Sequence, residues 1–231
     1  METLTWIFTG LLVISLFFFI FSMIKNWSIL NKISRIFILP FVSGIILMFL
    51  KEQLPEAGHI LFLSILALGI CCISEIFLTF ENQKLLVFIG RVIFLISLFP
   101  WIELYFSTLY IYKVRTWMII TASLIYFAIL VATLILSGKN NFGIYLGTLI
   151  ALAEASFLNF CAFISMGYDL KLNYVLLVIG TTLLLLGVIF YIKQSTKAFK
   201  MNKNLEIILR LLFIISAQSL ISVSGILMIA Q

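Results

Sequence analysis

Five charged residues stand at least five positions from either end of long apolar stretches of this chain, and they are the residues with which it could do chemistry. They are three carboxylates and two guanidiniums: Glu75, Glu103, Glu154, Arg91 and Arg210. At the centre of a bilayer a charged side chain costs at least ~2.5–3.5 kcal/mol, so each needs a partner, a watery cavity or a function. Carboxyl groups transfer protons, and arginines bind phosphate through paired hydrogen bonds. These residue types favour acid–base chemistry on a phosphate-bearing lipid.

The apolar stretches predict the elements that position these residues. About 20 apolar helical residues are needed to cross a hydrocarbon core ~30 Å thick. Eight stretches have close to that length or more: Leu4–Ile24, Ile33–Leu50, Ile60–Phe80, Leu85–Tyr112, Trp117–Ser137, Phe142–Met166, Tyr174–Ile192 and Leu205–Ala230. We therefore expect an all-α protein, a polytopic transmembrane helix bundle of eight spans.

The composition leaves no room for a soluble domain. The chain has 231 residues and a mean hydropathy of +1.25, and the spans with their short connectors use all of it. We expect a single transmembrane domain, residues 1–231. The first span follows Met1-Glu2, without a basic start, and no A-x-A-like cleavage site follows it. It is therefore interpreted as a transmembrane helix and not as a signal peptide.

The net charge of +6 reflects the side of the membrane on which the connectors lie, and does not indicate a nucleic-acid partner. Cytoplasmic loops of membrane proteins are enriched in Lys and Arg. The connectors after the odd-numbered spans hold Lys25, Lys32, Arg35, Lys84, Lys139, Lys193, Lys197, Lys200 and Lys203. The other connectors hold Lys51, Lys113, Arg115 and Lys171. Both termini are thus predicted outside the cytoplasm. The chain is rich in Lys, Asn, Ile and Phe, which is typical of an AT-rich genome and favours a bacterial source. The membrane would then be a bacterial cytoplasmic membrane.

Cysteine and histidine usage indicates no metal and no cofactor. Cys71, Cys72 and Cys161 all lie within spans, without a CxxC motif, and are interpreted as small apolar residues. His59 is the only histidine and Asp169 the only aspartate, which argues against a histidine metal site or a Ser-His-Asp triad.

Several of the charged side chains are expected at similar depth near the cytoplasmic leaflet. Glu75, Arg91 and Arg210 each lie five or six residues from the cytoplasmic end of their spans, at ~1.5 Å of rise per residue. Lys193 ends span 7 on the same side. One interpretation is a Glu75–Arg91 ion pair between adjacent helices. The other is a cavity open to the cytoplasmic leaflet, in which basic residues meet a lipid phosphate and a carboxylate transfers a proton.

Two further patterns place the remaining polar residues. Pro100 is predicted to kink span 4 or to end it early, which leaves Glu103 near the outer boundary as an interfacial carboxylate. Small residues recur every four positions in span 6, at Gly143, Gly147, Ala151 and Ala155. Glu154 lies on or beside that face and is predicted to point into the bundle. With Gln218 it would line the floor of the cavity.

Several spaced positions together resemble a known family. Arg35 opens span 2, Ser74-Glu75 lies late in span 3, and Gly90 follows Glu75 by fifteen residues. Gly187–Phe190 leads to Lys193-Gln194 at the end of span 7, Ala217–Ile221 reads Ala-Gln-Ser-Leu-Ile, and Tyr145 lies early in span 6. In order and spacing this resembles the YhhN family, eight-helix membrane proteins that include lysoplasmalogenases. The chain departs from the family where members carry a second aspartate in span 7, and Ile96 lies near the position of a span-4 histidine.

The resemblance implies a hydrolase that cleaves the vinyl ether of a lysophospholipid into a fatty aldehyde and a glycerophospho-headgroup. Proton transfer to the β-carbon of the vinyl ether is the slow step, and it calls for a general acid that is protonated near neutral pH. Glu75 would be that acid, and Glu154 would replace the missing second carboxylate. Arg91, Arg210 and Lys193 would hold the phosphate, with Gln218 lining the same site.

Two other classes of function stay open. A non-catalytic relative would bind or sense a membrane lipid in the same cavity, which the missing second aspartate favours. A transporter or accessory membrane subunit would show broken spans in matching positions of two halves. Gly69 and Gly187 precede Glu75 and Lys193 by the same six residues, which is too little to establish a repeat.

Overall fold

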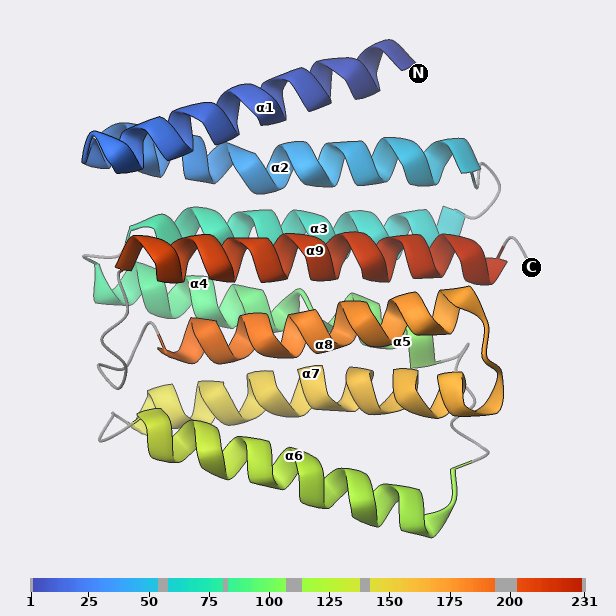
Figure 1. Ribbon diagram of the computed structural model, residues 1–231. Coiled ribbons are helices and arrows are strands. Elements are labelled where there is room, and N and C mark those ends of the chain that lie inside the picture. Colours follow the sequence, from blue (N-terminus) through green and yellow to red (C-terminus); the bar gives the residue numbers. More distant parts are fainter. Residues whose placement is uncertain are drawn as a thin grey trace. The chain divides into compact units, whose positions relative to one another are not determined.

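The computed structural model describes residues 2–53, 58–80, 83–106, 114–137, 142–193 and 203–229. All regular secondary structure in these ranges is helical (Figure 1). The helices are α1 (Glu2–Ile24), α2 (Ser28–Gln53), α3 (Gly58–Thr79), α4 (Lys84–Ile96), α5 (Phe99–Phe106), α6 (Thr116–Ser137), α7 (Phe142–Tyr168), α8 (Leu172–Lys193) and α9 (Lys203–Ile229).

Among the described residues, eight segments are long and apolar enough to cross a membrane. Seven of them are single helices, and the eighth, Leu85–Phe106, combines α4 and α5. The prediction of an all-α, eight-span transmembrane bundle is confirmed, and the chain is an integral, multi-pass membrane protein.

Span 2 begins earlier than its hydropathy predicts. The apolar stretch starts at Ile33, but α2 begins at Ser28, directly after a tight turn in which Asn26 has a φ of 56°. Asparagine tolerates this left-handed conformation better than most residues do. Because of the earlier start, Arg35 lies about two turns inside the helix instead of at its entrance.

Span 4 is broken where Pro100 predicts a break. α4 ends at Ile96, residues 97–98 form a turn, and α5 begins at Phe99. Proline has no backbone N–H, so Pro100 cannot donate to the carbonyl of Ile96, four residues earlier. Ser97 instead closes the end of α4 with bonds from its N–H to the carbonyls of Ile93 and Phe94. Glu103 is exposed on α5.

The described chain divides into two compact units, and the division falls within α5. Unit 1 comprises residues up to Trp101, and unit 2 comprises residues from Ile102 to Ile229. In unit 1, α1 packs against α2, α2 packs against α3, and α3 packs against α4. In unit 2, α7, α8 and α9 pack in the same sequential way, and α6 contacts both α7 and α8 (Figure 1). The prediction of a single domain stays a prediction.

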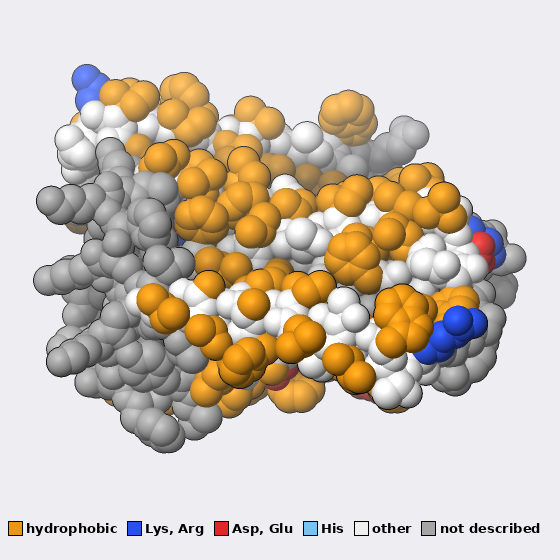
Figure 2. Space-filling model, turned by 60° about the horizontal axis from the view of Figure 1, so that its bottom comes forward, with side chains coloured by type: hydrophobic (Ala, Val, Ile, Leu, Met, Phe, Trp, Pro, Cys, Tyr) orange, Lys and Arg blue, Asp and Glu red, His pale blue; other side chains and the backbone are white. Residues whose placement is uncertain are grey.

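The outer surface is apolar along the length of the helices. Phe17 on α1 and Phe127 on α6 are examples of large apolar side chains that are well exposed. On the face drawn in Figure 2, hydrophobic side chains dominate and the visible Lys and Arg lie toward the ends. This is the surface that a lipid-embedded bundle presents, since the hydrocarbon requires no polar covering.

Candidate functional site

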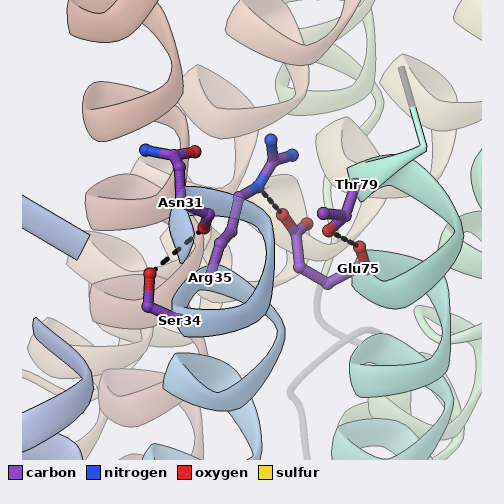
Figure 3. Close-up of polar contacts among 5 residues, drawn as sticks. All are labelled: Asn31, Ser34, Arg35, Glu75 and Thr79. Atoms are coloured by element: carbon purple, nitrogen blue, oxygen red, sulfur yellow. Dashed lines mark hydrogen bonds and ion pairs between the residues drawn. The ribbon is translucent and has the colours of Figure 1, made fainter. Parts of the chain in front are cut away.

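The strongest polar feature of unit 1 is a buried ion pair between α2 and α3. Arg35 Nε donates a hydrogen bond to Glu75 Oε1 at 2.8 Å, and the two side chains are only 2% and 5% exposed (Figure 3). The bond joins one guanidinium nitrogen to one carboxylate oxygen. Figure 3 shows the two terminal nitrogens of the guanidinium pointing away from the carboxylate.

The local structure of both helices fixes the pair at one end of unit 1. Arg35 is about two turns from the start of α2, and Glu75 is about one turn from the end of α3. Ser34 Oγ donates to the carbonyls of Leu30 and Asn31, and Thr79 Oγ1 donates to the carbonyl of Glu75 at 2.8 Å (Figure 3). The hydroxyls beside both charges are thus satisfied within their own helices.

The residue before Glu75 ties α3 to α4. Ser74 Oγ donates to the carbonyl of Gly90 at 2.7 Å, and Ser74 is buried. A Cβ on Gly90 would lie 3.0 Å from Phe77 Cβ and from Leu78 Cγ. Only glycine lets the two helices approach this closely without displacing a neighbour. Glu75 is therefore held from α2 through Arg35 and from α4 through its neighbour Ser74.

Arg91 directly follows Gly90 and is half-buried on α4. Because α3 and α4 pack together, Arg91 belongs to the same unit as Arg35 and Glu75. The expected Glu75–Arg91 ion pair stays a prediction. What the sequence did not indicate is that Arg35 is a partner of Glu75.

Unit 2 contains a buried polar network without charges. Asn159 on α7 is 4% exposed and accepts a hydrogen bond from the Tyr126 hydroxyl of α6 at 2.7 Å. Its amide nitrogen donates to Thr181 Oγ1 and Thr182 Oγ1 of α8, each at 3.0 Å. One amide thus links three transmembrane helices, and its acceptor and both of its donor hydrogens have partners.

The predicted residues Gln218 and Arg210 lie on α9 and are fully buried. A Cβ on Gly180 of α8 would lie 3.0 Å from Leu220 Cβ, which fixes the register of these two antiparallel helices. By that register Gln218 is level with Thr182, and so with the Asn159 network. Arg210 lies about two turns from Gln218 toward the start of α9.

Glu154 lies on α7 and is half-buried. Its Oε2 is buried without a hydrogen-bond partner, and no ion pair to Glu154 exists among the described residues. The small residues Ala151 and Ala155 beside it are buried, as the pattern in span 6 predicts. Glu154 itself lies at the edge of that face, because Ile150 and Phe157 on its other side are exposed.

The remaining predicted residue, Lys193, is the last residue of α8, and its side chain lies outside the described part. The structure thus brings Glu75 together with Arg35 and places Arg91 on the adjoining helix of unit 1. It places Glu154, Arg210 and Gln218 in unit 2. Among the described residues, no three His, Cys, Asp or Glu side chains gather as a metal site would require.

Two elements of these sites were missed in the sequence. Arg35 was placed at the entrance of span 2 because the apolar run begins beside it, so it was counted as a connector charge. Asn159 stands alone in an apolar run, and nothing in its neighbours along the chain marks Tyr126, Thr181 or Thr182 as partners. A helical-wheel comparison of α7 with α8, with the polar positions aligned, is the signal that could have found this network.

Comparison with known proteins gives no match to a protein-family model, a curated protein or a solved structure. The function has to be inferred from the chemistry of the residues themselves.

Proposed function

We propose that this chain is a lysoplasmalogenase-like hydrolase of the YhhN type, which cleaves the vinyl ether of a lysophospholipid within unit 1. The observation that carries the proposal is the connection of three positions on which the resemblance rests. Arg35 forms an ion pair with Glu75, and the preceding residue, Ser74, donates a hydrogen bond to the carbonyl of Gly90. These positions lie 40 and 16 residues apart in the sequence. If the resemblance were a chance match among apolar helices, there would be no reason for these positions to be hydrogen-bonded to one another.

The energetics of the pair support a role beyond folding. Taking two charges out of water costs several kcal/mol for each ion, and their attraction often fails to recover that cost. Well-packed apolar residues would stabilise the helix contact at least as well. An ionisable residue within a membrane span is by default a candidate for function, and Glu75 with Arg35 fits that description.

The proposed reaction uses Glu75 as both acid and base. In the structure Glu75 is paired with Arg35 as a carboxylate. Arrival of the lipid phosphate gives Arg35 and Arg91 a competing anion, and Glu75 then takes up a proton from solvent hydronium, which it gives back to the solvent when the products leave and the pair with Arg35 forms again. It donates this proton to the β-carbon of the vinyl ether, which leaves an oxocarbenium ion. Water adds to the ion and returns a proton to Glu75, and the resulting hemiacetal collapses to the aldehyde and the headgroup alcohol. A single carboxyl suffices because the two proton transfers are sequential.

The other predicted residues have no part in this scheme. Glu154, Arg210 and Gln218 belong to unit 2, and Lys193 has no described side chain. Their roles in catalysis or in phosphate binding stay predictions.

The proposal includes an orientation. The Arg35–Glu75 pair lies at the end of unit 1 where α1 is joined to α2 and α3 is joined to α4. The distribution of Lys and Arg supports placing this end on the cytoplasmic side of a bacterial cytoplasmic membrane, with both termini outside the cytoplasm. A reporter enzyme fused to the C-terminus is expected to be found outside the cytoplasm. Cytoplasmic activity would contradict the orientation.

A second candidate function is non-catalytic binding of the same class of lipid. The observation that favours it is the ion pair itself, because a general acid has to be protonated and Glu75 is held by Arg35. In this case Arg35 and Arg91 would bind the phosphate, and no bond of the lipid would be broken.

The deciding experiment measures aldehyde release from a lysoplasmalogen by the detergent-purified protein. The wild type is expected to release aldehyde, and Glu75→Gln is expected to release none. Glu103→Gln is the matched control, because Glu103 is an exposed carboxyl on α5 and should leave the activity unchanged. A lysophospholipid with a saturated ether is the substrate control and should yield nothing. No release by folded wild type, with lipid still bound, would establish the second function.

A further inference from the structure

Glu154 is placed where an ionised carboxylate is poorly accommodated. It lies next to the midpoint of the 27-residue helix α7, inside the candidate membrane span Leu149–Tyr168. It is the only charged residue on that helix. Its Oε2 is buried and has no hydrogen-bond donor. The other oxygen has none among the described residues either, since neither a hydrogen bond nor an ion pair reaches Glu154 there.

The helices that contact α7 supply no positive charge at this depth. On α5, whose Phe106 stacks on Phe157 of α7, the titratable groups are Glu103 and Tyr105, and neither is a cation. α6 carries no charged residue, and its titratable group is Tyr126, whose hydroxyl donates to Asn159. The only charged residue of α8 is Lys193 at its end. The hydrogen bonds from Asn159 to Thr181 and Thr182 fix the register of α7 and α8, and they place Glu154 level with Leu186.

Lys193 is seven residues beyond that level, ~10 Å along the helix axis. The other titratable groups described on these helices are Cys161 and Tyr168 of α7 and Tyr174 of α8. Tyr168 and Tyr174 lie at the opposite end, and none of the three carries a positive charge.

We propose that Glu154 is a proton-binding site on α7 of unit 2, which holds its proton at neutral pH. The neutral carboxyl requires no counter-charge, and its position at the edge of the buried face leaves it reachable from the lipid side. This inference does not depend on the hydrolase proposal, which concerns Arg35 and Glu75 in unit 1. The two carboxyls differ in the way they are accommodated: Glu75 is an ion-paired carboxylate, and Glu154 is a protonated acid.

Labelling with dicyclohexylcarbodiimide tests the proposal on the full-length protein in lipid vesicles. This apolar reagent dissolves in the membrane and reacts with protonated carboxyls. The carboxyl O–H adds across one C=N bond, and acyl transfer to nitrogen leaves a stable N-acylurea. Peptide mass spectrometry then locates the label. At pH 7, we expect at least about tenfold more label on Glu154 than on Glu75.

Substitutions and an infrared measurement provide the controls. Glu154→Gln should abolish the label on α7, whereas Glu103→Gln should leave it intact. The infrared carbonyl band of a protonated carboxyl should be present in the wild type at pH 7 and absent in Glu154→Gln, a readout that needs no reagent access. If Glu154→Gln does not fold, mapping of the label in the wild type is still decisive.

Three results would overturn the assignment. The first is a label on Glu154 that appears only at acidic pH. The second is equal labelling of Glu75 and Glu154 at pH 7. The third is suppression of the label by sodium ions at constant pH, which would make Glu154 a ligand for a metal cation instead of a proton.

Discussion

The two units of this protein bury polar groups in the membrane in opposite ways. Unit 1 buries two full charges and pairs them across α2 and α3, through Arg35 and Glu75. Unit 2 also buries the charged Arg210, but its described network across three helices is uncharged, with Asn159 satisfied by one tyrosine and two threonines. Each arrangement gives a polar side chain a partner on another helix.

The difference lies in what each arrangement costs and what it can do. The amide network of unit 2 requires no separation of charge and resembles the hydrogen bonding that holds many transmembrane helices together. The ion pair of unit 1 is an expensive way to join two helices. The ion pair is also the arrangement that offers a proton acceptor, Glu75, and an anion-binding group, Arg35. For this reason we propose function for unit 1 and a packing role for the network of unit 2.

The largest effect is expected from leaving one charge of unit 1 without its partner. Arg35→Gln should destabilise the protein by about 3–5 kcal/mol, because Glu75 would remain buried and uncompensated. Unfolding in mixed detergent micelles measures this loss. The double variant Arg35→Met with Glu75→Leu should recover most of it. If the double variant loses as much stability as Arg35→Gln, the two charges are not coupled, and the comparison of the two units fails.

A smaller effect is expected where α3 and α4 approach closely. Gly90→Ala should cost about 1–3 kcal/mol, since the added methyl would lie 3.0 Å from carbon atoms of Phe77 and Leu78. Gly69→Ala on α3 is the matched control, because nothing lies within 4 Å of its added Cβ. That control should be neutral or slightly stabilising. Equal losses in the two variants would show that α3 and α4 are not tightly packed at Gly90.

The network of unit 2 is expected to be weaker than the ion pair. Interhelical hydrogen bonds in membranes average ~0.6 kcal/mol and reach ~1.7. Asn159→Leu should therefore cost about 1–2 kcal/mol, and Thr182→Val, which removes one bond, should cost less than half of that. Unfolding under the same conditions allows a direct comparison with Arg35→Gln. A loss from Asn159→Leu as large as that from Arg35→Gln would contradict the contrast between the units.

The smallest effect concerns the contact between α5 and α9 in unit 2. The Tyr105 hydroxyl donates to the carbonyl of Ile221 and lies against Gly225, where a Cβ would be 3.1 Å from the hydroxyl oxygen. Tyr105→Phe removes the hydroxyl and with it this hydrogen bond, and should cost about 0.5–1.5 kcal/mol. Gly225→Val should cost more, since it also displaces the ring. The reverse order would show that the bond, and not the packing, holds α5.

Much of the fold could be predicted because hydropathy reports directly on membrane burial. The eight apolar stretches correspond to the eight candidate spans, and the missing N–H of Pro100 predicts the break between α4 and α5. The start of α2 could not be read in this way. Helices extend past the hydrocarbon, and Ser28 to Lys32 look like a connector although they are helical.

The site was predictable in its residue types and not in its pairings. The cost of burying a charge identifies Glu75 as a residue that needs a partner, but it does not say which basic residue supplies one. Arg35 and Arg91 lie on the two helices that flank α3, and composition cannot choose between them. Asn159 was missed because a single amide in an apolar run costs less than a charge and attracts no notice until its partners on α6 and α8 are known.

The most direct test of the account is whether the Arg35–Glu75 pair serves a lipid or only the fold. Binding of a lysophospholipid to the purified wild type can be compared by calorimetry with binding to the apolar double variant Arg35→Met with Glu75→Leu. The variant is expected to stay folded and to lose at least about tenfold in affinity, because each charged phosphate contact contributes more than ~1.4 kcal/mol. Unchanged affinity in a folded double variant would show that the pair is structural, and would contradict the assignment of function to unit 1.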